Sequence, residues 1–274
     1  MDINFNLHID ELNNRGITIL KNFIPHEICD SIKNDYYIFK NNNDCILTEN
    51  KLGSRLYNLH LISENALNLL FTDELMMLLD KYFGKSTALN STIYFEEGSQ
   101  QCIHRDTPYF WSEPYAGEFV GVWFAFEDTS ELNGKLEYYP YGHKFKIDTY
   151  DFSKKNINNS THELFDLYSK EILNLCKENN LELESPDIKK GDVIIWHADL
   201  PHGGSIIKNV GSSRHSLVGH YLPDNAYVQT IDYFFGRSEK SKIMDYIDSI
   251  KNRRMRNVNL TSFAINTKCN DGIE

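Results

Sequence analysis

The chain has 274 residues, with 28 Lys and Arg against 39 Asp and Glu, so its formal net charge is −11 at pH 7. Hydrophobic residues make up 41% of it, which is enough apolar material for a core and excludes a disordered or fibrous protein. The acidic balance argues against nucleic-acid binding, because such binding generally needs a positive field.

The sequence also bears on where the protein works. The opening residues, MDINFNLHID, contain neither a basic region nor an apolar region, so we expect no secretory signal. Apolar runs such as residues 193–196 are too short to span a bilayer. The five cysteines form no CxxC pair, which disfavours a disulfide framework or a thiolate zinc site. We therefore expect a soluble, cytoplasmic protein that does not act at a membrane.

The first third of the chain has a mixed pattern. Residues 16–24 are β-rich, and Pro25 then opens a helical stretch over residues 25–40, with proline in a favoured first-turn position. Asp73 is expected to cap a second helix over residues 73–84, which ends at Gly84.

Five later segments are rich in β-branched and aromatic residues and are punctuated by Gly and Pro, which is typical of strands. They are residues 88–95, 119–127, 136–139, 193–197 and 215–222. A helix over residues 161–179 interrupts them, and a last helix over residues 238–256 closes the fold. This order favours a mainly β fold with flanking helices, either a β-sandwich or a jelly roll.

We expect one domain over residues 1–274. Its helical amino-terminal part runs to about residue 85, its jelly-roll core covers about residues 86–223, and its helical carboxyl-terminal part covers about residues 224–274. The sequence contains neither a glycine-rich phosphate loop nor a GxSxG motif, so it does not favour a Rossmann or an α/β-hydrolase fold.

His104-Arg105-Asp106 is the first group of residues that points to chemistry. Alternate residues of a strand face the same side, so His104 and Asp106 would point together, with Arg105 facing away. An imidazole and a carboxylate on one face make two sides of a metal site. Without a third ligand, a surface contact between His and Asp is the more common outcome.

His202 is the best candidate for that third ligand. It follows a β-run and lies in DLPHGGS, where two glycines let the backbone pass close to a ligand. Two His and one carboxylate form the facial triad of non-haem Fe(II) oxygenases, whereas zinc more often has another ligand set. His197 and Asp199 form a competing HxD pattern, but they precede Pro201 and are expected to turn out of the strand.

Arg214 lies 12 residues beyond His202, and on a strand it would share a face with Ser216. A guanidinium beside a hydroxyl is a good receptor for a carboxylate, although an isolated Arg-x-Ser is usually a surface turn.

The aromatic segment 107–117, TPYFWSEPYAG, is either buried or a wall of the substrate site. Arg55 is a weaker candidate for contact with an anionic substrate. His220 is expected to be a buried structural histidine.

The sequence resembles the phytanoyl-CoA dioxygenase-like family of Fe(II)/2-oxoglutarate oxygenases over roughly residues 90–223. The resemblance rests on the HRD at 104–106, on GVWFAFEDTSELNGKLEYYPYGHK at 121–144, and on GDVIIWHADLPHGGS followed by SRHSLVGHYLP within 191–223. Tyr141-Gly142 departs from the Gly-Ser that is usual in the middle motif, at a turn that holds no proposed ligand.

This resemblance implies a double-stranded β-helix, which is a cupin-like jelly roll with the metal at its open end. It implies that His104, Asp106 and His202 are the catalytic iron ligands.

The resemblance also implies a binding site for the cosubstrate. Arg214 would bind the distal carboxylate of 2-oxoglutarate, with Ser216 assisting. Asn90 and Tyr94, on the strand before the HRD, would also contact the cosubstrate.

We therefore predict an Fe(II)- and 2-oxoglutarate-dependent dioxygenase that uses O2 to hydroxylate a small molecule, with release of succinate and CO2. The expected substrate is a biosynthetic intermediate, such as a sugar or a natural-product precursor, because no basic cluster for the phosphates of an acyl-CoA surrounds the motifs. Two alternatives remain open. One is a non-redox cupin-type metalloenzyme, in which Arg214 and Ser216 would have no task. The other is a non-catalytic jelly-roll binding protein.

Overall fold

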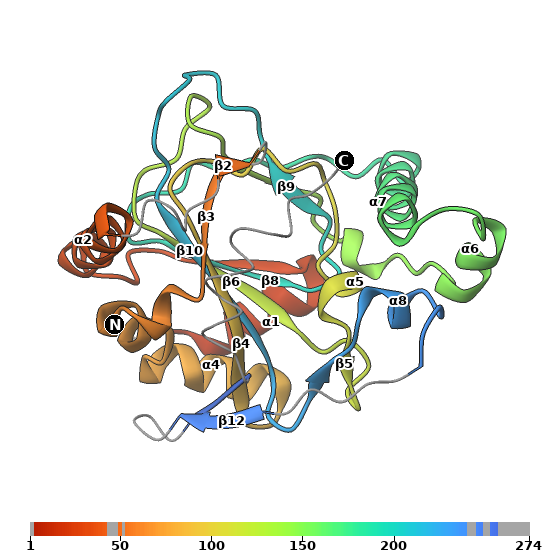
Figure 1. Ribbon diagram of the computed structural model, residues 1–274, viewed down its shortest axis with the longest axis horizontal. Helices are drawn as coiled ribbons and strands as arrows, with labels where there is room; N and C mark the ends of the chain where they lie inside the picture. Colours follow the sequence, from red (N-terminus) through yellow and green to blue (C-terminus); the bar gives the residue numbers. More distant parts are fainter. Residues whose placement is uncertain (1–2, 43–48, 51–52, 240–244, 249–252, 257–274) are drawn as a thin grey trace.

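The centre of the computed structural model, which describes residues 3–42, 49–50, 53–239, 245–248 and 253–256, is a large sheet (Figure 1). Its antiparallel core has the order β1–β8–β6–β10–β4. The bounds of these strands are Ile17–Leu20, Val193–His197, Val120–Ala125, Ser216–Pro223 and Thr87–Phe95 respectively. The five strands expected from β-branched and aromatic runs are present, β8 with the expected bounds and the others with ends that differ by one or two residues.

Side-chain alternation along β6 shows how the sheet separates two cores. Val122 and Phe124 point toward the amino-terminal helices and join the larger hydrophobic cluster. Trp123 and Ala125 point the other way, into the interior of the jelly roll. Since every residue of β6 is buried, both faces of the sheet are covered, and a near-continuous apolar strand results.

Four helices from the first third of the chain cover one face of the sheet. They are α1 (Phe5–Arg15), α2 (His26–Asn42), α3 (Glu64–Leu70) and α4 (Asp73–Phe83). Between them lie the short helix η1 (Leu59–Leu61) and strand β3 (Gly53–Tyr57), which pairs with β2 (Glu49–Asn50) and with β4.

The other face of the sheet is closed by a smaller, two-stranded sheet and by later helices. Strand β7 (Leu136–Tyr138) pairs with β9 (His202–Gly204), and side chains from β4, β6, β8 and β10 fill the space between the two sheets. In Figure 1, α6 (Thr149–Lys155) and α7 (Thr161–Glu178) lie on the opposite side of the molecule from α2. The remaining elements there are η2 (Gly142–Lys144), α5 (Thr107–Phe110), α8 (Ile231–Phe234) and the pair β5 (Ser112–Glu113) with β11 (Tyr227–Val228).

Two details of the expected helices are wrong. Helix α4 has Thr72 at its N-cap position, and Asp73 is the first residue inside the helix. The carboxyl-terminal helix over residues 238–256 is contradicted where the structure describes that range. There, β12 (Asp245–Asp248) pairs with β13 (Arg253–Arg256), and Met255 of β13 pairs with Leu89 of the central sheet. Backbone pairing with β4 satisfies this segment in place of internal helical hydrogen bonds.

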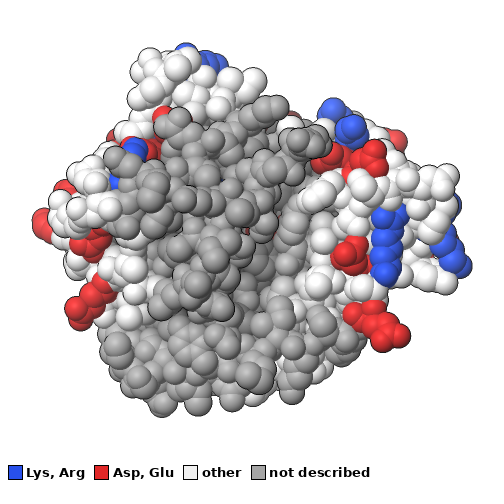
Figure 2. Space-filling model, in the orientation of Figure 1, with Lys and Arg blue, Asp and Glu red and all other residues white. Residues whose placement is uncertain are grey.

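Charged side chains of both signs are mixed on the surface of the described residues (Figure 2). On the face shown in Figure 2, the Lys and Arg side chains of the described residues lie in separate groups among Asp and Glu, and do not merge into one basic surface. No helix in the described part of the chain is both long enough and apolar enough to cross a bilayer.

Candidate active site

His104, Asp106 and His202 come together at one end of the jelly roll. Each offers a ligand atom to a common point, and these atoms lie within 4.8 Å of one another. Asp106 stands between the two imidazoles, with Oδ1 3.6 Å from His104 Nε2 and Oδ2 3.7 Å from His202 Nε2. All three side chains are buried, so the cluster is a formed site within the fold.

Backbone hydrogen bonds hold the two ligand segments together. His104 and His202 exchange reciprocal N–H···O=C bonds of 2.9 Å, and the Asp106 N–H donates to the carbonyl of Ala198 across 3.1 Å. The HRD segment is thus an isolated bridge followed by the start of α5, and the strand expected there does not form. A Cβ on Gly203 would lie 2.6 Å from the Gln101 carbonyl oxygen, so the glycine allows this close backbone approach.

The ring orientation of both histidines suits metal binding. His104 Nδ1 lies 2.8 Å from the carbonyl oxygen of Cys102, and His202 Nδ1 lies 2.9 Å from that of Leu200. A carbonyl can only accept, so each Nδ1 carries the proton, and each Nε2 presents its lone pair to the cluster. The side-chain amide of Gln101 donates to His104 Nε2 across 3.2 Å, at the position where a metal would bind.

The protonation states agree with this assignment. Burial by itself raises the pKa of Asp106, but attraction to His202 and His104 when these rings carry a second proton outweighs that effect and holds the pKa well below the usual range of a carboxyl group. Burial lowers the pKa of His202. At neutral pH the cluster therefore offers a carboxylate and the neutral imidazole of His202, which are the forms that bind a divalent cation.

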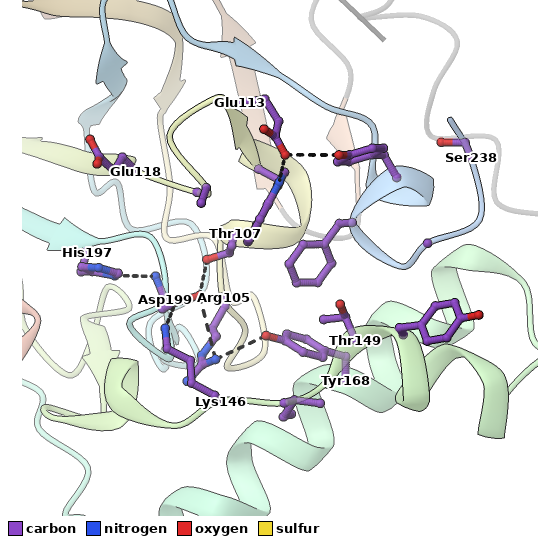
Figure 3. Close-up of a pocket in the computed structure, with 18 residues that line it drawn as sticks. Arg105, Thr107, Glu113, Glu118, Lys146, Thr149, Tyr168, His197, Asp199 and Ser238 are labelled. Carbon is purple, nitrogen blue, oxygen red and sulfur yellow. Dashed lines mark hydrogen bonds and ion pairs between the residues drawn. The ribbon is translucent and has the colours of Figure 1, made fainter. Parts of the chain in front are cut away.

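Arg105 and the competing pair His197 and Asp199 do not face the metal cavity, and they line a separate cavity instead. Arg105 is 1% exposed and donates to the carbonyl oxygens of Gly142 and Phe145 at 2.6 and 2.9 Å. Figure 3 shows Arg105 beside Asp199, in a second cavity of about 700 Å3 that His197 also lines. Asp199 accepts from Thr107 and forms an ion pair with Lys146, so it is occupied structurally and does not join the metal cluster.

The metal cluster opens into its own cavity of about 460 Å3. Apart from the ligands, the walls are mainly apolar and aromatic. The described lining residues include Ile93, Phe95, Tyr109, Phe110, Trp123, Leu136, Trp196 and Val218. Tyr109 and Phe110 come from the aromatic segment 107–117, which therefore supplies a wall here, while Trp111 faces the second cavity. A cavity of this size suits a small ligand held by a few polar groups.

Arg214 reaches into the same cavity as the metal cluster. Its Nη1 donates to the Gly134 carbonyl oxygen across 2.7 Å, and its guanidinium lies over the Trp123 ring, with Cζ 5.4 Å from the centroid. Among the described residues, its buried Nε has no hydrogen-bond partner, and neither does the buried hydroxyl of Ser216, the first residue of β10. Ser216 is not among the described residues that line the cavity. Burial lowers the pKa of Arg214 to about 10, so it remains a cation at neutral pH.

Asn90 and Tyr94, which were expected to contact the cosubstrate, are not among the described residues that line the metal cavity. Tyr94 points to the helix-covered face of the sheet, where its hydroxyl contacts His215 Nδ1 at 2.7 Å, and it does not line the metal cavity. The expected contact between Tyr94 and the cosubstrate is therefore not retained. Asn90 has no Cα partner in β10, because the register shifts between Ser91 and Leu89, and its amide donates to the Ser91 hydroxyl.

Two residues at the metal cluster were not predicted from the sequence. Trp196 donates its indole N–H to Asp106 Oδ2 across 2.9 Å and packs against the His202 ring at a centroid distance of 4.7 Å. Gln101 is the other. Trp196 lies in β8, before His202 in the sequence, and Gln101 lies before the HRD, but nothing in their residue types alone marks them. His220 is buried, lines the cavity and contacts the Ser91 hydroxyl at 3.0 Å, as a structural histidine would.

A family model described as phytanoyl-CoA dioxygenase (PhyH) matches residues 12–216, which include the three candidate metal ligands. The chain belongs to the phytanoyl-CoA dioxygenase family. This confirms the resemblance drawn from the HRD and the two longer motifs. Family membership and the His-Asp-His cluster together make the chain a 2-oxoglutarate-dependent non-haem iron enzyme.

Solved structures share the fold. SnoK, a non-haem α-ketoglutarate-dependent carbocyclase from nogalamycin biosynthesis, matches with a TM-score of 0.65 and 11% identity over 88% of this chain and 93% of its own. The epimerase SnoN, solved with Fe3+, α-ketoglutarate and nogalamycin RO, matches with a TM-score of 0.64 and 12% identity over 93% and 96%. HygX from Streptomyces hygroscopicus, with nickel and 2-oxoglutarate bound, matches with a TM-score of 0.57 and 12% identity over 81% and 88%.

At these identities the likeness concerns the fold alone, and it confirms the expected double-stranded β-helix for this member of the phytanoyl-CoA dioxygenase family. No curated protein matches the chain in sequence.

Proposed function

We propose that this enzyme hydroxylates a small-molecule biosynthetic intermediate, with conversion of 2-oxoglutarate to succinate and CO2. The observation that carries the proposal is the shared cavity, in which the metal cluster and the partly unpartnered guanidinium of Arg214 face one space. Iron and 2-oxoglutarate, when bound, supply oxidation by O2, with one oxygen atom ending in succinate and the other in the hydroxylated product.

The residues of this chain then have distinct tasks. His104, Asp106 and His202 would hold Fe(II), and their three-sided arrangement leaves the remaining coordination positions to the cosubstrate and O2. Arg214 would orient 2-oxoglutarate by its distal carboxylate, for which its free Nε and the Ser216 hydroxyl provide unused donors. Asn90 remains a prediction for the cosubstrate site.

The aromatic side chains that line the cavity would exclude water and hold the substrate beside the metal. Tyr109, Phe110 and Trp196 line the cavity, and these rings limit the space beside the metal cluster. Water exclusion matters here because O2 activation without a bound C–H group wastes the cosubstrate.

Asp106 favours oxygen transfer over halogenation. Related oxygenases that halogenate lack the carboxylate ligand, and halide takes its position. Here the Asp106 carboxylate occupies that position between the two histidines. Hydroxylation is the simplest outcome of such a site. SnoK and SnoN are named as a carbocyclase and an epimerase, so ring closure or epimerisation is the alternative that product analysis must distinguish.

The test measures cosubstrate and product together. Purified protein with Fe(II), 2-oxoglutarate and O2 is expected to form succinate slowly on its own and faster with a substrate found by screening biosynthetic intermediates. Mass spectrometry with 18O2 should show one labelled oxygen in the product. His202→Ala serves as the matched control. Succinate formation that is equal in wild type and His202→Ala would contradict the proposal, and so would a product without labelled oxygen that is isomeric with its substrate.

A further inference from the structure

The metal cavity contains a second arginine that neither the metal site nor the cosubstrate site uses. Apart from histidines, the charged side chains among its described lining residues are Arg55, Asp106 and Arg214. Asp106 belongs to the metal, and Arg214 suits the distal carboxylate of 2-oxoglutarate. Arg55 is therefore the charged side chain of this cavity, among the described residues, that neither the metal nor the cosubstrate needs.

Contacts with strand β4 position the Arg55 side chain. It lies on β3, where its Cα partner on β4 is Phe95, and its guanidinium lies over the Phe95 ring with Cζ 5.2 Å from the centroid. Its one described hydrogen bond is long: Nη2 donates to the side-chain oxygen of Gln101 across 3.4 Å. Its Nε is buried and has no partner among the described residues. Such a cation has donors to spare, and burial makes an unmet donor costly.

The charge of the loaded site gives Arg55 a specific partner. One Fe(II) and the Arg214 cation together balance the Asp106 carboxylate and the two carboxylates of 2-oxoglutarate. The positive charge of Arg55 is then uncompensated, and no acidic side chain other than Asp106 lines this cavity among the described residues. Arg55 is partly buried, and a bound ligand would remove it further from water, to a place where a cation is stable when it is paired. The remaining ligand is therefore expected to bring one negative charge.

We propose that Arg55 binds a carboxylate on the substrate, so that the enzyme acts on a small organic acid. The planar guanidinium matches a carboxylate through two parallel N–H donors, which a neutral sugar or alcohol cannot use in the same way. This inference rests on the proposed oxygenase function and narrows its substrate class.

The position of Arg55 also limits where the substrate is oxidised. Gln101 spans the distance between Arg55 and the metal position: its amide oxygen accepts from Arg55, and its NH2 lies at His104 Nε2, where a metal would bind. A carboxylate held by Arg55 is therefore one amide side chain away from the metal position. We expect the oxidised carbon to lie close to that carboxylate, because the cavity of about 460 Å3 is shared with 2-oxoglutarate and leaves room for a small acid.

Binding to the inactive loaded enzyme tests this without turnover. Calorimetry under anaerobic conditions, with Ni(II) and 2-oxoglutarate present, would compare monocarboxylic acids of about four to eight carbons with their primary amides. Wild type is expected to bind at least one acid about 10-fold to 100-fold more tightly than its amide, because a hydrogen bond to a charged group adds that much. Arg55→Gln should remove this preference, Arg55→Lys should keep part of it, and Lys208→Gln, at an exposed position, should leave it intact.

The outcomes separate this inference from the function on which it rests. Equal binding of acids and amides by wild type, or no binding of any acid, would overturn the role of Arg55. An Arg55→Gln variant that keeps the preference for the acid would do the same. A loss of 2-oxoglutarate affinity in Arg55→Gln would assign Arg55 to the cosubstrate instead. If wild type failed to bind 2-oxoglutarate at all, the oxygenase function itself would be wrong.

Discussion

The indole N–H of Trp196 donates to Asp106 Oδ2 across 2.9 Å, and the same ring packs against His202 at a centroid distance of 4.7 Å. One side chain thus orients two of the three metal ligands. Strand β6 makes room for it with Gly121, where a Cβ would lie 2.4 Å from the indole ring. The metal site therefore depends on packing inside the sheet as well as on the ligands.

Trp196→Phe is expected to weaken metal binding. Phenylalanine keeps much of the packing but removes the donor to Asp106, and loss of a partner that orients a metal ligand typically costs about 10-fold to 100-fold in affinity. Anaerobic calorimetric titration of the metal-free protein with Fe(II) measures the change. Trp111→Phe is the matched control, because Trp111 lines the second cavity and contacts Glu113 instead of a ligand. Equal losses in both variants would mean that the Trp196 hydrogen bond is irrelevant.

A second prediction separates the two HxD patterns of the sequence. His202→Ala should abolish tight Fe(II) binding, since it removes one of three ligands. His197→Ala should keep the metal, because His197 accepts from the Asp199 backbone N–H and faces the second cavity. Iron content after loading and desalting, together with the far-UV circular dichroism of each variant, gives the answer. Retention of iron by His202→Ala would refute the assigned triad.

A third prediction concerns stability against pH. His60 is 4% exposed, its Nδ1 contacts the Thr92 hydroxyl at 2.9 Å, and burial lowers its pKa to about 4. The folded state binds a proton at His60 less readily than the unfolded chain, whose histidine pKa is about 6.5. The stability associated with neutral His60 is therefore complete above about pH 6.5 and is lost as the pH falls toward about 4, by about 2 kcal/mol at about pH 5.

Urea unfolding of the metal-free protein near pH 7.5 and near pH 5 measures that loss. His60→Asn is the control, because asparagine can still bond to Thr92 but does not titrate. The free energy of unfolding of wild type should fall by about 2 kcal/mol more than that of the variant over this interval. Parallel losses in the two proteins would show that other groups carry the pH dependence.

How far the site could be predicted from sequence differs between its strands. Along β10 the alternation is regular over Ser216 to His220, and Val218 and His220 line the metal cavity. Arg214, which precedes the strand, lines the same cavity. Along β4 the register shifts at Asn90, and parity cannot say which face of a strand is the inner one. The family resemblance, and not the strand pattern, suggested that Tyr94 contacts the cosubstrate, and its side chain lies on the helix-covered face.

The HRD segment shows a different limit. His104 and Asp106 converge as expected, but the cause is the pairing of His104 with His202 and of Asp106 with Ala198, contacts between segments about a hundred residues apart. The strand pair β12–β13 likewise depends on pairing with β4, which overrides a local helical pattern. Local patterns predicted the residue types of the site, while long-range backbone pairing decided how they meet.

The last prediction concerns how Arg214 holds the cosubstrate. The distal carboxylate of 2-oxoglutarate must leave water to enter the cavity, so it needs a matched cation there. Arg214 is 3% exposed in this cavity and is fixed by the Gly134 carbonyl and by the Trp123 ring, and its Nε has no partner in the described part of the chain. Removal of one partner of such a buried pair typically costs about 2–5 kcal/mol.

Arg214→Leu should therefore weaken 2-oxoglutarate binding by roughly 30-fold to several thousand-fold. Arg214→Lys should be milder but still impaired, because an ammonium group cannot reproduce the two parallel donors of a guanidinium. Both variants should still bind Fe(II), since Arg214 is not among the metal ligands. Anaerobic titration of the Fe(II) protein with 2-oxoglutarate, followed by the metal-to-ligand charge-transfer band, measures the affinity. An unchanged affinity in Arg214→Leu would mean that the cosubstrate is held elsewhere in the cavity.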